Sequence, residues 1–300
     1  MNALIFDTET TGKKNPGLVE AAWIPIPSSD SIAKLAGELV GNERARGTVA
    51  QRFNPGKPIE YGAMATHHIT NEAVALCPPG STFRLPDGIS YLFGHKIDYD
   101  IGVIAAAAPA EGYGEIKGID TLALAQRLWP ECDSHTQSAL LYFLMPEVAQ
   151  SLAMHAHDAA VDVGINLRLA SRIVQELQRR GALRADGAWS FDELFEISEI
   201  ARVPELMPFG KHQGLPISEV PHSYWDWYLR QADVDPYLVR AYREGGRPWP
   251  WPSAASGQPV QQVSAQAPVP EPPAKVSTTP RFSFSPRPRA GAAGPGPNQI

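Results

Sequence analysis

The chain has 300 residues, of which 43% are hydrophobic and 19% charged, so it can bury a sizeable core without disulfide or metal staples. Its two cysteines, Cys77 and Cys132, lie far apart and lack C-x-x-C spacing, which excludes a disulfide framework and a cysteine zinc site. The net charge of −6 argues against a protein that coats nucleic acid through a broad basic face, but not against an enzyme that grips one nucleic-acid end.

Alternating strand and helix patterns fill the first half of the chain. Apolar runs rich in β-branched and aromatic residues predict strands, and helical spacing with a capping residue, Thr70, predicts short helices between them. The strands are expected at residues 3–6, 19–24, 49–53, 90–94 and 115–119, and the helices at residues 61–66, 71–76, 98–108 and 121–128. A long surface connection with one helical turn is expected over residues 28–48. This alternation predicts an α/β fold.

One long helix is expected from residue 157 onward. Its apolar residues recur every four positions and so mark one helical face, and Arg179, Arg180 and Gly181 form a helix stop. The recurring residues are Val161, Ile165, Leu169, Ile173 and Leu177.

The aromatic-rich block at residues 191–249 is predicted to form a small second module after a linker at 182–190. Residues 209–214 predict a hairpin that leads into a helix at 221–229. Two interpretations stay open for its aromatic side chains. Together with Lys211 and Arg230 they can hold single-stranded DNA by stacking and charge; alternatively, Trp225, Trp227 and Tyr228 build the core of the module.

Residues 250–300 are predicted to be a disordered tail. Residues 251–300 hold 11 of the 29 prolines, and such a composition cannot repay chain entropy by burying a core. This segment has four basic residues and one acidic residue, so the remaining 250 residues carry a charge of −9. Its role in binding nucleic acid stays open.

The sequence predicts no membrane attachment. Its longest apolar runs are far shorter than the roughly 20 residues of a membrane span, and residues 1–12 lack the basic and apolar regions of a secretion signal. With few cysteines, the protein is expected in the reducing cytoplasm.

Two acids, Asp7 and Glu9, stand two positions apart at the end of the first predicted strand. Residues i and i+2 of a strand share a face, so both carboxylates project to the same side and repel each other. A hard divalent cation such as Mg²⁺ or Mn²⁺ is the expected partner for paired carboxylates without cysteine. The alternative is a solvated acidic pair at a strand end.

Further acids and a histidine occur at two helix starts. Asp98 and Asp100 follow the predicted strand at 90–94, where an acid either faces a metal or caps the helix. His157 and Asp162 stand at the start of the long helix. Residues five apart on a helix point in different directions, so His157 must lie in the approach loop if both serve one site.

In this order, the motifs resemble those of the DEDD exonucleases with the ribonuclease H-like fold. The resemblance covers residues 3–180 and rests on Asp-Thr-Glu-Thr-Thr-Gly at 7–12, residues 63–70, Gly94-His95 with Tyr99-Asp100, residues 121–130, and His157 with Asp162. The tyrosine subclass has its tyrosine four residues before the final acid. Asp158 stands there, so the histidine subclass, DEDDh, is the one matched.

The resemblance implies a mixed central sheet flanked by helices over residues 1–181. It also implies that two divalent metal ions, Mg²⁺ or Mn²⁺, are held by Asp7, Glu9, Asp100 and Asp162, and that His157 is the general base. The reaction implied is removal of nucleoside 5′-monophosphates from DNA 3′ ends, in repair, recombination or proofreading.

The resemblance further implies a pocket for the terminal nucleotide around Thr8, Thr10, Met64 and His67. Met64 would wedge against the base, and His67 would bond the sugar or phosphate. The alternative is that Met64 packs in the core and His67 caps a helix. One departure concerns Lys96, which replaces the asparagine common in the family; this lysine either contacts phosphate or points away.

The expected substrate is the 3′ end of DNA, single-stranded in preference. Two other functions stay open: an exoribonuclease of the same superfamily, because tolerance of the 2′-hydroxyl depends on pocket shape, and a catalytically silent nucleic-acid-binding module. The silent module is disfavoured because all four acids and the histidine are present. Protein partners, processivity, pathway and oligomeric state are not indicated.

Overall fold

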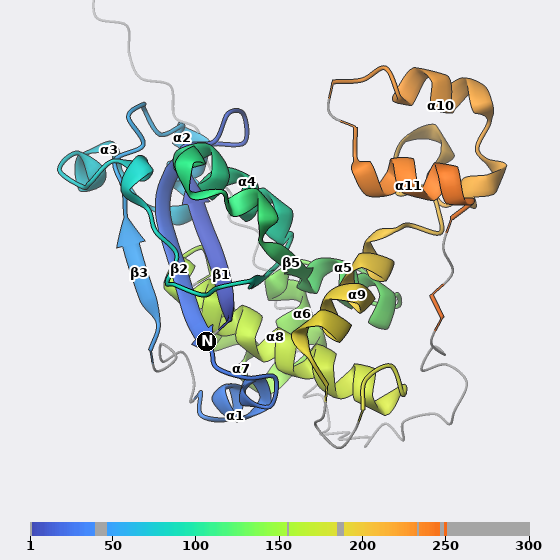
Figure 1. The fold of residues 1–300 in the computed structure, drawn as a ribbon, viewed down its shortest axis with the longest axis horizontal. Coiled ribbons are helices and arrows are strands. Elements are labelled where there is room, and N and C mark those ends of the chain that lie inside the picture. Colours follow the sequence, from blue (N-terminus) through green and yellow to red (C-terminus); the bar gives the residue numbers. More distant parts are fainter. Residues whose placement is uncertain are drawn as a thin grey trace, which may run out of the picture. The chain divides into compact units, whose positions relative to one another are not determined.

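A mixed sheet of five strands forms the centre of the fold (Figure 1). Its strands are β1 (Ala3–Thr10), β2 (Leu18–Ile26), β3 (Val49–Arg52), β4 (Tyr91–Gly94) and β5 (Lys117–Asp120), and their spatial order is β3-β2-β1-β4-β5. β1 pairs antiparallel with β2 and parallel with β4, β2 pairs antiparallel with β3, and β4 pairs parallel with β5. The carboxyl ends of β1, β4 and β5 therefore lie at one edge of the sheet.

The computed structural model describes residues 2–39, 47–154, 156–184, 189–232, 234–246 and 249–250. Residues 251–300, which make up nearly all of the predicted tail, lie outside this range, as does part of the expected connection at 28–48. Among the described helices, none combines the length and apolarity needed to cross a membrane.

The predicted strands and helices form, with shifted ends, and the sheet flanked by helices confirms the predicted fold class. The helices of the described chain are α1 (Ser31–Gly37), α2 (Tyr61–His67), α3 (Asn71–Val74), α4 (Ile97–Ala107), α5 (Thr121–Leu128), α6 (Gln137–Leu144), α7 (Pro146–Ala153), α8 (Ala159–Arg179), α9 (Phe191–Arg202), α10 (His222–Tyr228) and α11 (Pro236–Glu244). The sequence analysis assigned no helix to α6 or α7. Both have local start signals: Thr136 caps α6 through the amide of Ala139, and Pro146 occupies the first turn of α7.

Alternation along β1 divides the core into two layers. Ala3 and Ile5 belong to the hydrophobic cluster that contains the buried side of α8, whereas Leu4 and Phe6 belong to the cluster that contains α4. The two helices thus cover opposite faces of the sheet. Each residue of β1 beyond Phe6 is directed toward one helix or the other by the same alternation.

A separate hydrophobic cluster begins after α9. The buried residues of α9, among them Phe191 and Ile197, pack into the cluster shared with α8, while the cluster that includes Trp225 and Leu238 starts at Val203. α9 therefore contributes to the core of the sheet, although the sequence placed it in the second module. The division of the chain into domains stays a prediction.

Candidate active site

Three of the predicted acids meet beside α8. Asp7 and Glu9 follow Ala3 and Ile5 in the alternation of β1, so they lie on the face covered by α8. Asp162 lies in the first turn of α8, and Asp7, Glu9 and Asp162 each place a carboxylate oxygen within 4.8 Å of the others. The expectation that Asp7 and Glu9 share one side is confirmed.

The fourth acid, Asp100, reaches the site from the other face of the sheet. It lies in the first turn of α4, is 5% exposed, and accepts a hydrogen bond of 2.6 Å from the hydroxyl of Thr8. Its charge raises the pKa of Asp7. The carboxyl ends of β1 and β4 and the starts of α4 and α8 thus position all four acids.

Without a cation, the carboxylates of this site repel one another. Burial, together with the neighbouring carboxylates, raises the pKa of Glu9 to about 8 and that of Asp7 well above its usual range. Burial also raises the pKa values of Asp100 and Asp162 to about 7. In the described part of the chain, no lysine or arginine forms an ion pair with any of these four acids. Four crowded oxygen donors without a counter-charge fit a divalent cation.

His157 precedes α8 and lies in the approach loop, as its spacing from Asp162 required. Its backbone is left-handed, with a φ of 72°, and its amide donates a hydrogen bond of 3.1 Å to Oδ2 of Asp162. The next residue, Asp158, caps α8 through the amide of Ala160. The loop that presents His157 is therefore held by one of the acids of the cluster.

Thr10 and His67 are joined on the α4 side of β1. The Thr10 hydroxyl lies 2.8 Å from the hydroxyl of Tyr99, and its carbonyl lies 3.2 Å from Nε2 of His67. Nδ1 of His67 accepts a hydrogen bond from the amide of Ile69, so Nε2 carries the proton and donates it to Thr10. Both ring nitrogens have protein partners. These contacts fix the His67 ring beside Thr10, and its expected bond to the sugar or phosphate stays a prediction.

Met64 lies on α2 and is partly buried. It packs against the small cluster formed by Val19, Ile59, Ile69 and Val74. This packing agrees with the core interpretation of Met64, and part of the side chain stays accessible. Its role as a wedge against a base stays a prediction.

The motif ends at Gly12 for a steric reason. A Cβ at this position would lie 2.4 Å from the carboxyl carbon of Glu60, and the backbone has a φ of 149°. The amide of Glu60 donates to the carbonyl of Thr11 and brings the start of α2 against the end of β1. The φ of residue 12 is one that L side chains rarely adopt, so this position favours glycine.

A fifth carboxylate near the site escaped the sequence analysis. Glu20 of β2 stands directly opposite Glu9, and its charge raises the pKa values of both Asp7 and Glu9. Arg52 of β3 forms an ion pair of 2.8 Å with Glu20. A correct alignment of β1 with β2 would have revealed Glu20, but the sequence alone does not fix that register.

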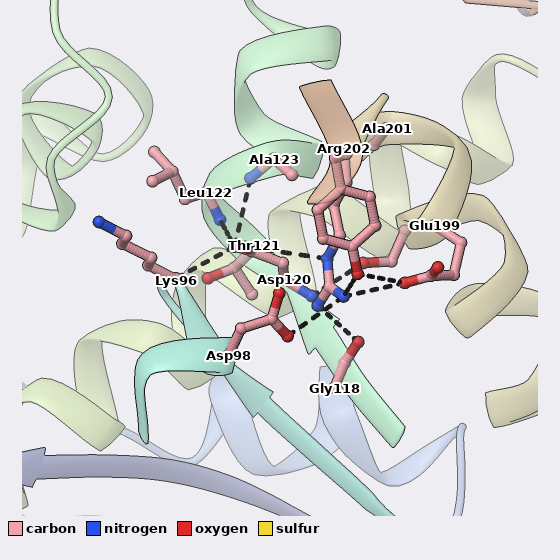
Figure 2. A network of polar contacts seen from close by, with 12 residues as sticks. Lys96, Asp98, Gly118, Asp120, Thr121, Leu122, Ala123, Glu199, Ala201 and Arg202 are labelled. Atoms are coloured by element: carbon pink, nitrogen blue, oxygen red, sulfur yellow. Dashed lines mark hydrogen bonds and ion pairs between the residues drawn. The ribbon is translucent and has the colours of Figure 1, made fainter. Parts of the chain in front are cut away.

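A buried arginine ties α9 to the helix that carries Asp100. Figure 2 shows Arg202 lying between Asp98 of α4 and Glu199, with ion pairs of 3.3 and 2.9 Å. It also donates a hydrogen bond of 2.7 Å to the carbonyl of Gly118 in β5 (Figure 2). Asp98 thus serves as an anchor at the start of α4 rather than as a fifth acid of the cluster. The sequence analysis did not single out Arg202.

Comparisons with known proteins agree with this geometry. The chain is 26% identical over 234 residues to Exodeoxyribonuclease 10 of Escherichia coli K12, a match that covers 76% of this chain and 91% of the relative. This relative is also called exonuclease X. The chain is an exonuclease that is similar to the DEDDh exonucleases.

Two weaker matches accompany this one. The chain is 25% identical over 201 residues to a DNA polymerase III subunit epsilon-like protein of Rhodobacter capsulatus, covering 61% of the chain and 27% of the relative. A solved structure of exonuclease X with 5′ overhanging duplex DNA aligns with a TM-score of 0.43 and 23% identity, covering 65% of the chain and 99% of that structure.

The region after the nuclease fold matches a different family model. The model is described as "Putative quorum-sensing-regulated virulence factor" and matches residues 196–233. These residues include the end of α9 and all of α10. The chain therefore carries, after its sheet, a segment that is similar to another protein family.

Proposed function

We propose that this exonuclease removes nucleoside 5′-monophosphates from the 3′ ends of DNA, with His157 as general base and with Asp7, Glu9, Asp100 and Asp162 as ligands of two divalent metal ions. The cluster of four carboxylates, three of them with oxygens within 4.8 Å of one another, carries this proposal. A DNA substrate is supported by the relative named Exodeoxyribonuclease 10.

The residues of the chain divide the work between binding and proton transfer. The four acids provide oxygen donors for Mg²⁺ or Mn²⁺, and the crowding that raises their pKa values is relieved when a cation is bound. Bound divalent ions supply charge stabilisation for displacement at phosphorus. His157 takes the proton of the attacking water, which suits an imidazole at neutral pH.

The terminal nucleotide is proposed to bind beside β1, near Thr8, Thr10 and Met64. Thr10 is oriented by Tyr99 and, through its carbonyl, by His67. Contacts of this kind to the sugar–phosphate backbone do not depend on base sequence. This arrangement suits an enzyme that must remove any nucleotide it meets.

The test is digestion of a 5′-labelled single-stranded DNA and of its RNA counterpart with Mg²⁺, with Mn²⁺ and with chelator. We expect a metal-dependent ladder that shortens the DNA from its 3′ end and that is lost in Asp7→Ala and Asp162→Ala while both variants stay folded. A preference for the RNA would replace the DNA assignment with an exoribonuclease. Full activity of either variant at matched purity would overturn the ligand assignment.

A further inference from the structure

The aromatic residues of the second module fall into two groups. Trp225 is fully buried and stacks on Tyr242 at 4.4 Å, and Tyr224 and Tyr228 are less than a tenth exposed. Trp227 and Phe209, in contrast, are 48% and 40% exposed. The core of the module is therefore complete without these two rings, and its packing does not explain them.

The two exposed rings lie along one stretch of α10. Trp227 contacts Tyr224 with ring centroids 5.2 Å apart, and Phe209 contacts Tyr228 at 5.8 Å. Tyr224 and Tyr228 are four residues apart on α10 and so are neighbours on one helical face. Each exposed ring thus packs against one of the two buried tyrosines.

A glycine allows a basic turn to approach Tyr224, one of these buried tyrosines. Gly210 has a φ of 72°, and a Cβ there would lie 2.7 Å from the hydroxyl of Tyr224. This close approach places Nζ of Lys211 at 5.7 Å from the Tyr224 ring centre and sets His212 edge-on against the same ring at 4.8 Å. The turn thus holds the ammonium group of Lys211 beside the aromatic residues of α10.

The cations of this surface are not neutralised within the described chain. Lys211 and Arg230, which follows Trp227 by three residues, form no ion pair with a described acid, whereas Arg202 and Arg240 of the neighbouring helices are each paired with Glu199. The nearest acid in sequence to Trp227 is Asp226, which is turned by about 100° around the helix. The positive charges of Lys211 and Arg230 are thus available to an anionic partner.

We propose that Phe209, Lys211, Trp227 and Arg230 form a binding surface for single-stranded DNA, and we name these four residues the stacking surface. The proposal rests on the proposed function, because the strand bound there is the part of the substrate that lies away from the reacting 3′ end. Exposed rings stack on bases of any sequence, and unpaired cations beside them meet the phosphates. A protein partner of an apolar patch would not require unpaired cations beside the rings.

The test compares a long and a short substrate on the full chain. Trp227→Ala is expected to weaken equilibrium binding of a 30-nucleotide oligo(dT), measured by fluorescence anisotropy in chelator, by about tenfold. Hydrolysis of a trinucleotide, which reaches only the active site, is expected to be unchanged. Trp227→Phe keeps a stacking ring and should retain most of the affinity. Leu229→Ala, which alters the exposed residue directly after α10, is the matched control and should bind like the parent chain.

Replacing both cations tests the phosphate contacts. Lys211→Gln with Arg230→Gln is expected to reduce the slope of log affinity against log salt concentration by about 1.4, as for two phosphates of a single strand. Unchanged oligo(dT) affinity in Trp227→Ala, or a salt slope unchanged in the double variant, would overturn the proposal. Because binding is measured in chelator, these outcomes are independent of whether the chain hydrolyses DNA. A parent chain that does not hydrolyse the trinucleotide would instead contradict the proposed function.

Discussion

The hydroxyl of Thr8 donates a hydrogen bond of 2.6 Å to Oδ1 of Asp100, and this bond joins β1 to the first turn of α4. Both residues are less than a tenth exposed. The bond lowers the pKa of Asp100 and so partly offsets the effect of burial. Thr8, expected to contact the substrate, therefore also acts on the charge of an acid of the cluster.

Thr8→Val is expected to raise the pKa of Asp100 further, because a hydrogen bond to a charged carboxylate is lost. Protons compete with metal for the carboxylate. A rise of about one pKa unit would increase the Mg²⁺ concentration for half-maximal activity at pH 6.5 by about tenfold. Thr8→Ser keeps the hydroxyl and should restore the parent value. Equal metal dependence of the valine and serine variants would show that the bond does not tune Asp100.

Much of this fold can be predicted from local periodicity. Alternation in β1 put Asp7 and Glu9 on one face, and a four-residue repeat gave α8 and placed His157 before it. Both patterns depend on residues close together in the sequence.

The features that were missed depend on residues distant in the sequence. Glu20 comes near Glu9 only through the register of β1 with β2, and Arg202 meets Asp98 only when the end of α9 reaches the start of α4. A pattern of local propensities does not contain the partner across a strand pair or across two helices. The exposure of Trp227 in the stacking surface likewise depends on how its neighbours pack, which local propensities do not determine.

The metal-free protein is expected to lose stability as pH rises from about 5 to about 8. Glu9 has a pKa of about 8 in the folded chain and about 4.5 unfolded, so the folded state binds more protons in this range. Stability is therefore lost as the group ionises. Thermal melts in chelator should show the melting temperature falling by at least about 5 °C.

Glu9→Gln cannot ionise at this position, so the melting temperature of this variant in chelator should fall less as the pH rises. Saturating Mg²⁺ should raise the melting temperature of the parent chain most at pH 8, because a ligand that binds only the folded state stabilises it. A melting temperature in chelator that is as dependent on pH in Glu9→Gln as in the parent would contradict the assignment.

His157→Asn is expected to lower kcat by about a hundredfold or more, the usual contribution of a general base. Asparagine suits this variant because it tolerates the left-handed backbone seen at residue 157, so the hydrogen bond from the amide to Asp162 is preserved. The Mg²⁺-induced rise in melting temperature should be unchanged. Near-normal kcat in this variant would remove His157 from the proposed proton transfer.

Lys96 has a left-handed backbone, with a φ of 74°, at the residue that precedes α4. Its amide donates a hydrogen bond to Asp120, but Figure 2 shows its side chain pointing away from Asp98 and Asp120. Lys96 also lines a cavity of about 1010 Å³ together with Tyr99, the residue that contacts Thr10. We expect this long cationic side chain, which lines the cavity, to contact a phosphate of the substrate.

Lys96→Asn distinguishes the effect of the backbone conformation at residue 96 from the effect of the lysine charge. Asparagine favours the left-handed conformation, so the variant should be more stable by about 0.5–1 kcal/mol. Its affinity for single-stranded DNA should nevertheless fall, and the slope of log affinity against log salt should decrease by about 0.7, as expected when one phosphate contact is lost. The opposite signs of these two effects distinguish a phosphate contact from a structural role. A gain in stability with unchanged DNA affinity would mean that the ammonium of Lys96 points into solvent when DNA is bound.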